Sequence, residues 1–105
     1  TSAASVSLSL AEQGHELIRS KGCVACHTES ETPNALGPSL RGIWGKEQEL
    51  ADGSKVRVND QFIRESLMDP NAKVAKGFNP VMPTFKGLLD EAEINAVTAY
   101  IKTLK

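Results

Sequence analysis

Apolar positions near the N-terminus recur with helical spacing. Leu10, Leu17 and Ile18 fall on one face of a helix. Ser9, followed three positions later by Glu12, forms the capping box that is typical of a helix start. The pattern therefore predicts a helix that begins after Ser9 and directs one apolar face toward the core.

Two glycines, one inside this predicted helix and one at its end, indicate how it packs and where it stops. Gly14 lies inside it, where glycine is less favourable than alanine by about 1 kcal/mol. We interpret Gly14 as the place where another backbone approaches closely, and a merely tolerated weak point is the alternative. Gly22 predicts the end of the helix, because glycine readily adopts the left-handed conformation found after a helix C-terminus.

Two further helices are predicted in the second half of the chain. The first begins at Asn59 or Asp60 and is closed by Pro70. The second begins after Asp90, and Glu93 completes its capping box. Their apolar positions are Phe62, Ile63 and Leu67 in the first helix and Ile94, Val97, Ile101 and Leu104 in the second.

The segments between the helices lack periodicity. Residues 28–45 and 70–87 contain all 5 Pro and many of the 8 Gly residues, so both are predicted as long loops. Asp52 and Gly53 form a turn signal within residues 47–58, where we expect a short β-hairpin. The predicted fold class is all-α, with three main helices and this hairpin. Loops of such length are uncommon in a compact domain unless they serve a site.

Composition restricts the function classes. The 105 residues suffice for one domain, expected over 9–105, and the small polar residues 1–8 are expected to be a linker or a processed N-terminal tail. A net charge of -1 gives no support for nucleic-acid binding, and no apolar run approaches the roughly 18 residues of a membrane span. Aromatic residues make up only 5%, so the core needs apolar bulk from another source.

The only two cysteines lie in the sequence CVACH at residues 23–27. This C-x-x-C-H spacing is the attachment signal for c-type haem, in which two thiols reach one edge of the porphyrin and the histidine becomes the proximal iron ligand. Zinc would need about four ligands, and beyond this segment only His15 is a good candidate. A thioredoxin-like dithiol would need a βαβ context, and a disulfide over this spacing would be strained. We therefore expect one covalent haem c, whose macrocycle also supplies the missing bulk.

The sixth iron ligand has three candidates. Met68 falls inside a predicted helix, and His15 is expected on a helix surface. Met82 stands between Pro80 and Pro83 in an extended segment, where a thioether is held in place by the stiff backbone. We expect Met82 to be the axial ligand opposite His27.

These motifs, in chain order, resemble a class I c-type cytochrome. The matching segments are CVACH at 23–27, GPSLRG at 37–42 and Met82 with Pro83. A narrower resemblance is to the cytochrome c domain of subunit II of caa(3)-type haem-copper oxidases. It is carried by GKEQELADGS at 45–54, FIRESL at 62–67, DPNAK at 69–73 and KGF at 76–78.

The resemblance implies roles for individual residues. Cys23 and Cys26 would be thioether anchors, and His27 and Met82 the axial pair. Pro38 matches the proline whose carbonyl accepts a hydrogen bond from the proximal imidazole. Two further residues, Trp44 and Arg41, are expected to contact the haem. The indole N–H of Trp44 is expected to reach a haem propionate, and the alternative is that Trp44 is only a core aromatic residue.

The resemblance also implies that the two terminal helices cross. Gly14 and Ile18 would face Val97 and Tyr100 at this crossing. The family usually has an aromatic residue at the position of Ile18, so we expect a slightly less filled contact.

The function implied is single-electron transfer by a low-spin His/Met haem, without enzymatic activity of the domain itself. The expected donor is a soluble cytochrome or another small electron carrier, and the expected acceptor is the copper domain of a terminal oxidase. A free diffusible periplasmic carrier is the alternative, and a haem enzyme or gas sensor with an open sixth position is a third. Haem attachment in this family occurs outside the cytoplasm, so we expect the periplasm or the outer face of the bacterial membrane, with any membrane tether outside this segment.

Electrons are expected to pass through an apolar rim between the Cys23–His27 and Met82 segments. Lys73, Lys76 and Lys86 add positive charge to residues 70–89, which contain no Asp or Glu. These lysines are predicted to steer an acidic partner, and solubility of the loop is the alternative explanation. The residues available to the rim are Val24, Ala25, Phe78, Pro80, Val81 and Pro83.

Overall fold

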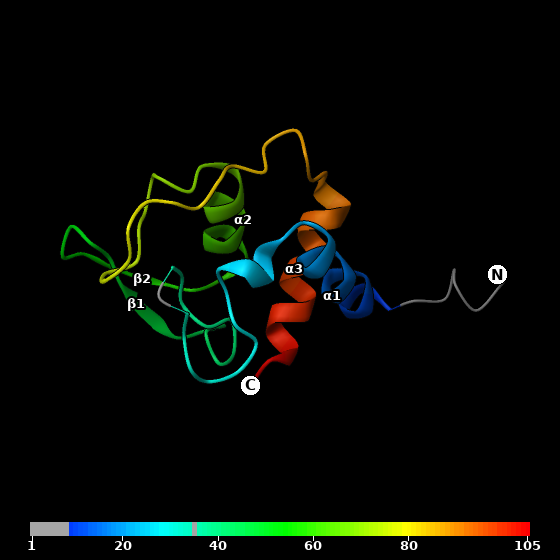
Figure 1. The fold of residues 1–105 in the computed structure, drawn as a ribbon, viewed down its shortest axis with the longest axis horizontal. Coiled ribbons are helices and arrows are strands. Elements are labelled where there is room, and N and C mark those ends of the chain that lie inside the picture. The colour runs from blue at the N-terminus through cyan, green and yellow to red at the C-terminus, as the bar shows by residue number, and fades with distance from the viewer. Residues whose placement is uncertain (1–8, 35) are drawn as a thin grey trace, which may run out of the picture.

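The computed structural model describes residues 9–34 and 36–105 and contains helices joined by long loops. The segment 1–8, expected to be a linker or tail, lies outside the described residues. Figure 1 shows the three α-helices gathered on one side and a small sheet on the other. The elements are α1 (Leu10–Ser20), the 3-10 turn η2 (Cys23–Ala25), β1 (Glu47–Glu49), β2 (Lys55–Arg57), α2 (Asp60–Met68) and α3 (Glu91–Thr103).

Side-chain caps fix where the α-helices begin. Ser9 and Glu12 form the predicted capping box of α1, with both side chain to backbone hydrogen bonds present. The amide of Phe62 donates to the side chain of Asn59, which decides between the two candidate caps of α2. Asp90 caps α3 in the same reciprocal way as Ser9 caps α1. All three predicted helix starts are confirmed.

The N-terminal and C-terminal helices pack side by side (Figure 1). Gly14 lies at their contact, and a Cβ atom there would stand 1.9 Å from the carbonyl oxygen of Ala96 and 2.9 Å from Cβ of Tyr100. No side chain fits this space, which confirms the close approach predicted from the sequence. Ile18, one turn further along, is only 1% exposed, so the expected underfilling of the crossing does not leave it accessible.

The hairpin predicted around residues 47–58 is present. β1 and β2 pair antiparallel, with Gln48 opposite Val56, and the turn between them contains Gly53 at φ 91°. Leu50, which directly follows β1, forms an isolated bridge with Ala75. The loop after α2 therefore runs back beside the hairpin, as its yellow trace in Figure 1 shows.

The buried core joins the helices to the loops. Leu10, which was expected on the buried face of α1, is 47% exposed; it is the first residue of the helix, and the close contact with α3 at Gly14 lies one turn further along. The clustered core residues are Ile18, Leu40, Val58, Ile63, Leu67, Phe85, Leu89, Ile94, Val97, Tyr100, Ile101 and Leu104.

Within the described part of the chain, no helix is long and apolar enough to cross a membrane.

Candidate functional site

A largely apolar cavity of about 260 Å³ lies between the helices and the long loops. Its walls come from the end of α1, from η2, α2 and α3, and from loop segments that include Pro38 and Met82. Side chains that are far apart in sequence thus face one space. The predicted site residues among its lining are Cys23, Cys26, His27, Pro38 and Met82.

The 3-10 turn places both cysteines beside the histidine. Gly22 adopts φ 78° and turns the chain out of α1. The carbonyl of Cys23 then accepts hydrogen bonds from the amides of Cys26, at 3.1 Å, and His27, at 2.9 Å. The sequence had indicated a helix end before the cysteines but not this extra turn. The 3-10 turn keeps both cysteines and the histidine on one short segment.

The chemistry of this segment disfavours the other interpretations of the cysteines. Both are unpaired thiols, and burial raises the pKa of the Cys23 thiol, so its surroundings suit an uncharged sulfur. In residues 9–34 and 36–105 no three His, Cys, Asp or Glu side chains form a group that could hold a metal ion. The sheet is a two-stranded antiparallel hairpin, which differs from the βαβ context of thioredoxin-like dithiols.

The imidazole of His27 is held by a backbone group. Its Nδ1 donates to the carbonyl oxygen of Pro38 at 2.8 Å, so Nε2 is the nitrogen that could bind a metal. Gly37 lies tightly against this pair, since a Cβ atom there would be 2.8 Å from the carbonyl oxygen of Cys26 and 3.0 Å from Cε1 of His27. A hydrogen bond of this kind fixes the ring plane and raises the basicity of a metal ligand.

The three candidate sixth ligands have different surroundings. Met82 is half-buried and lines the cavity. Met68 packs against the core but does not line the cavity. His15 stacks on Tyr100 with ring centroids 4.6 Å apart, and its Nε2 accepts a hydrogen bond from Arg19 at 3.0 Å. Among the described residues, Met82 is thus the candidate that shares the cavity with His27.

Trp44 and Arg41 are not among the lining residues. Trp44 is partly buried against the core, and the ammonium of Lys102 lies 4.5 Å from its ring centroid. Arg41 donates from Nε to the carbonyl of Glu29 at 2.7 Å and from a terminal nitrogen to the carbonyl of Lys105 at 3.3 Å. The structure therefore does not bring these two side chains together with the other predicted site residues.

Several polar lining residues had not been singled out from the sequence. Lys21 follows α1 directly, and Ser66 lies within α2. Gln48 belongs to the hairpin and donates to the carbonyl of Glu49 at 2.8 Å. Local patterns could not indicate them, because their nearness to the cavity depends on how α1, the hairpin and α2 pack around it.

The residues present fit a covalently attached haem. A flat macrocycle needs an extended apolar lining, two thiols for its vinyl groups and at least one iron ligand. The cavity offers all three, and the bond from His27 to Pro38 leaves one imidazole nitrogen available. Comparison with known families decides the matter, because the cytochrome c family model matches residues 11–105.

The chain belongs to the cytochrome c family. Cytochrome c2 iso-1 of Magnetospirillum molischianum is 32% identical, with 79% of this chain and 90% of that protein covered. Cytochrome c oxidase subunit 2 of Alkalihalophilus pseudofirmus is 27% identical over 91% of this chain but only 26% of its own length. Among solved structures, cytochrome cH from Methylobacterium extorquens is similar, with a TM-score of 0.64, 25% identity and coverage of 89% of this chain and 97% of the other.

Family membership and fold together establish the general function. This cytochrome c has the class I fold, binds one covalent haem c and transfers electrons. The haem iron supplies the one-electron chemistry. The protein supplies attachment through the C-x-x-C-H turn and an apolar cavity that limits contact with water.

Proposed function

We propose that the chain is a single-electron carrier in which His27 and Met82 are the axial ligands of a low-spin haem. Cys23 and Cys26 are its thioether anchors. One observation carries this proposal: Met82 and the Cys23–His27 turn line the same cavity, whereas Met68 and His15 do not. Two protein ligands leave no open position for a substrate, which fits electron transfer better than catalysis.

The ligands also indicate the range of the reduction potential. The thioether of Met82 is neutral and favours reduced iron, so a His/Met pair gives a higher potential than two histidines. The apolar lining acts in the same direction, because burial disfavours the additional charge of oxidised iron. A high potential suits a donor close to the oxygen-reducing end of a respiratory chain.

Replacement of the two methionines tests the ligand assignment. Met82→Ala should abolish the weak far-red band of the oxidised protein and lower the reduction potential, while Met68→Ala should leave both unchanged. The reverse result would show that Met68 is the ligand. Rapid CO binding by the reduced wild type at neutral pH, with a spectrum insensitive to Met82→Ala, would instead support an enzyme or sensor with an open sixth position.

We further propose that the electron acceptor is the copper centre of a terminal oxidase. The similarity to an oxidase subunit 2 supports this, because that alignment covers 91% of this chain, more than the 79% covered by cytochrome c2 iso-1. A soluble cytochrome or another small carrier would be the donor. In this arrangement the chain would be one domain of a membrane-tethered subunit.

A free diffusible carrier is the second candidate. The cytochrome c2 relatives favour it, because this chain covers 90% and 91% of the lengths of two of them. The coding sequence upstream of Thr1 discriminates between the two. A continuous reading frame through a copper-binding domain supports the oxidase role, and an export signal joined directly to this segment supports the diffusible carrier.

Both candidates place the protein in the periplasm or on the outer face of the bacterial membrane. Expression with an export signal should give coloured protein whose haem resists acid-acetone extraction, because Cys23 and Cys26 hold it covalently. Expression of the same segment without the signal should give apoprotein. Abundant cytoplasmic holoprotein would contradict the location, and extractable haem would contradict the attachment.

A further inference from the structure

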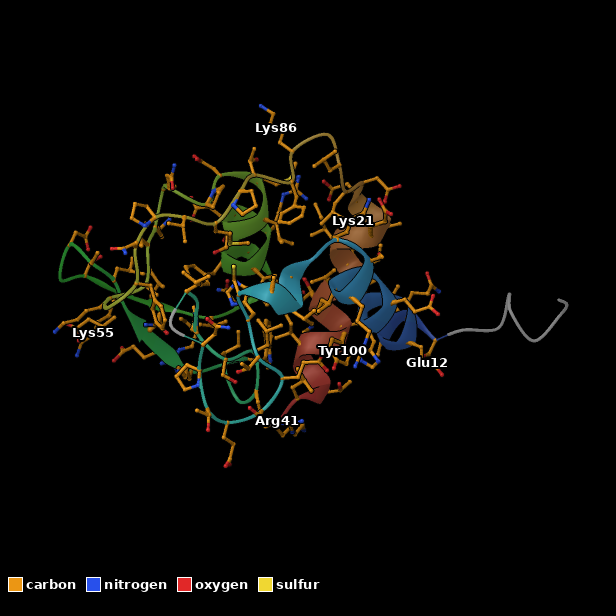
Figure 2. All side chains as sticks on the ribbon, viewed as in Figure 1. Glu12, Lys21, Arg41, Lys55, Lys86 and Tyr100 are labelled. Atoms are coloured by element: carbon orange, nitrogen blue, oxygen red, sulfur yellow. The ribbon has the colours of Figure 1, made fainter. Side chains whose placement is uncertain are left out.

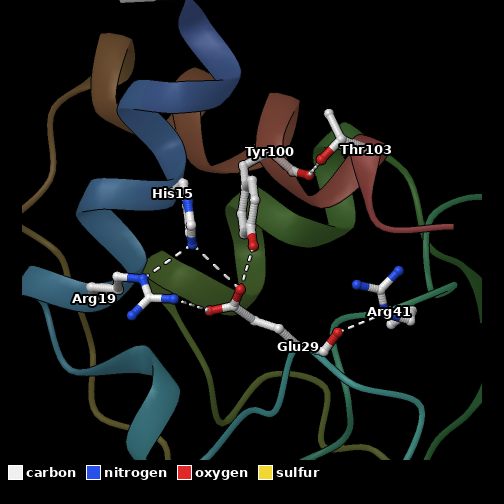
Figure 3. Close-up of polar contacts among 6 residues, drawn as sticks. All are labelled: His15, Arg19, Glu29, Arg41, Tyr100 and Thr103. Atoms are coloured by element: carbon white, nitrogen blue, oxygen red, sulfur yellow. Dashed lines mark hydrogen bonds and ion pairs between the residues drawn. The ribbon is translucent and has the colours of Figure 1, made fainter.

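The carboxylate of Glu29 joins the segment after the haem-attachment turn to both terminal helices. Glu29 stands two residues after His27, and its side chain is 24% exposed. Figure 3 shows it between α1 and α3, where it accepts a hydrogen bond from the hydroxyl of Tyr100. Nε2 of His15 lies 3.4 Å from the same carboxylate, and a terminal nitrogen of Arg19 lies 3.9 Å from it.

The helical side of this cluster is rigid. Tyr100 is 8% exposed, and its ring stacks on His15 with an interplanar angle of 15°. The helices that carry the two rings meet at Gly14 without room for a Cβ atom. Glu29 is therefore bound to a support that has little freedom to shift.

The backbone of Glu29 is hydrogen-bonded to a different part of the protein, the segment that follows Pro38. Its carbonyl oxygen accepts from Nε of Arg41 at 2.7 Å. On either side of Glu29, the Thr28 carbonyl accepts from the amide of Leu40 at 2.9 Å, and the Ser30 carbonyl accepts from the hydroxyl of Ser39. Residues 28–30 are thus bonded to residues 39–41. The carbonyl that accepts the hydrogen bond from His27 belongs to Pro38, the residue just before residues 39–41.

We propose that Glu29 is a positioning residue, which anchors the 28–30 segment to the terminal helices and thereby keeps the Pro38 carbonyl in hydrogen-bonding position for His27. The proposal rests on the proposed axial role of His27. Through this hydrogen bond the cluster controls the basicity of the imidazole, and so the relative stability of oxidised and reduced iron. Loss of the anchor weakens the bond, lowers imidazole basicity and raises the reduction potential.

Three variants of the haem-loaded protein test this. Glu29→Gln removes the charge and weakens the contacts with Tyr100, His15 and Arg19. Tyr100→Phe removes one hydroxyl and leaves the carboxylate in place. Glu31→Gln is the control for loss of charge alone, because Glu31 is exposed and lies two positions further from His27 than Glu29 does.

The first measurement is hydrogen exchange of the His27 Nδ1 proton by NMR of the reduced protein, and the second is the reduction potential. We expect exchange on the order of tenfold faster in Glu29→Gln, as for the loss of about one hydrogen bond, with a smaller increase in Tyr100→Phe. Both variants should have a higher potential than the wild type. Glu31→Gln should leave the exchange rate unchanged.

Two results would overturn the positioning role. One is unchanged His27 exchange in both Glu29→Gln and Tyr100→Phe. The other is a potential shift in Glu29→Gln no larger than that in Glu31→Gln, together with none in Tyr100→Phe. If Glu29→Gln does not load haem, Tyr100→Phe alone decides. A wild-type spectrum without low-spin His ligation would count against the proposed function itself.

Discussion

Tyr100 combines a buried ring with a hydroxyl that donates to the carboxylate of Glu29. Burial, followed by the hydrogen bond and the negative charge of Glu29, raises the pKa of Tyr100 to about 12. Its ordinary pKa is 10.0. The neutral phenol is therefore favoured in the folded protein over the phenolate.

This raised pKa predicts a loss of stability in alkali. Above pH 10 the unfolded chain releases the phenol proton while the folded protein retains it, so unfolding is increasingly favoured up to about pH 12. The contribution of Tyr100 is fully present below pH 10. Urea unfolding of the wild type at several pH values between 9 and 12 should show this decline, and it should be shallower in Tyr100→Phe. Equal slopes would contradict the role of Tyr100.

At the scale of elements, the crossing of α1 and α3 depends on one missing side chain. A Cβ atom at position 14 would overlap the carbonyl oxygen of Ala96 and touch Tyr100, and both atoms belong to the body of α3. Neither helix can relieve the overlap by rotating a flexible side chain. The helices would have to separate, and the packing of Ile18 against the core would loosen with them.

Gly14→Ala should accordingly lower the free energy of unfolding by about 1 to 3 kcal/mol, as for other overpacked cores. The higher helix propensity of alanine offsets about 1 kcal/mol of a larger steric cost. Chemical denaturation of the haem-loaded protein measures the change. Glu16→Ala, on the exposed side of α1, is the control and should change stability by less than about 0.5 kcal/mol. Equal effects of the two substitutions would show that the crossing tolerates a methyl group.

The elements and the site differed in how far the sequence could predict them. Caps and turns depend on residues three or four positions apart, so Ser9, Asn59 and Gly53 could be interpreted locally, and the structure agrees. The fixed spacing in residues 23–27 likewise indicated haem attachment. Trp44 and Arg41 were assigned by resemblance alone, and their contact with the haem stays a prediction. The ammonium of Lys102 lies over the Trp44 ring, and Arg41 donates to the carbonyls of Glu29 and Lys105. Local patterns cannot indicate such contacts, because they join segments that are not adjacent in the chain.

At the scale of the whole molecule, the charge around the cavity differs from that expected of the loop alone. Lys73 forms an ion pair with Glu65 of α2, and Lys76 lies 3.3 Å from Glu49 of β1. Acidic partners from distant segments thus offset two of the three lysines, which a count within residues 70–89 could not show. Of these three, Lys86 is the one without an acidic partner in the described chain.

Lys21 is a second lysine without an acidic partner in the described part of the chain. It lines the cavity directly. Figure 2 shows Lys21 at the end of α1 and Lys86 on the loop that leads into α3. Val24 and Val81 are 40% and 52% exposed on the two segments that carry the proposed haem ligands. Lys21 is three residues before Val24, and Lys86 is five residues after Val81, so both positive charges are carried by the segments that bear this apolar surface.

We predict that Lys21 and Lys86, rather than the paired lysines, steer an acidic redox partner. Lys86→Gln and Lys21→Gln should each slow second-order electron transfer by a factor of about two to five at low ionic strength, a small share of the roughly 10- to 1,000-fold effect of a whole charged surface. The difference from wild type should shrink as salt is added, because the Debye length falls to about 10 Å at 0.1 M. Stopped-flow kinetics with the physiological partner across ionic strength measure both effects.

The decisive control removes a whole ion pair. Lys76→Gln combined with Glu49→Gln leaves the net charge unchanged, so the field that an approaching partner experiences should hardly change, and the rate at low salt should remain that of the wild type. Lys76→Gln alone would leave the Glu49 carboxylate uncompensated and should slow the reaction. If the double variant is as slow as Lys86→Gln, the paired lysine itself contacts the partner. If no charge variant alters the rate at low salt, docking depends on the apolar surface around Val24 and Val81 alone.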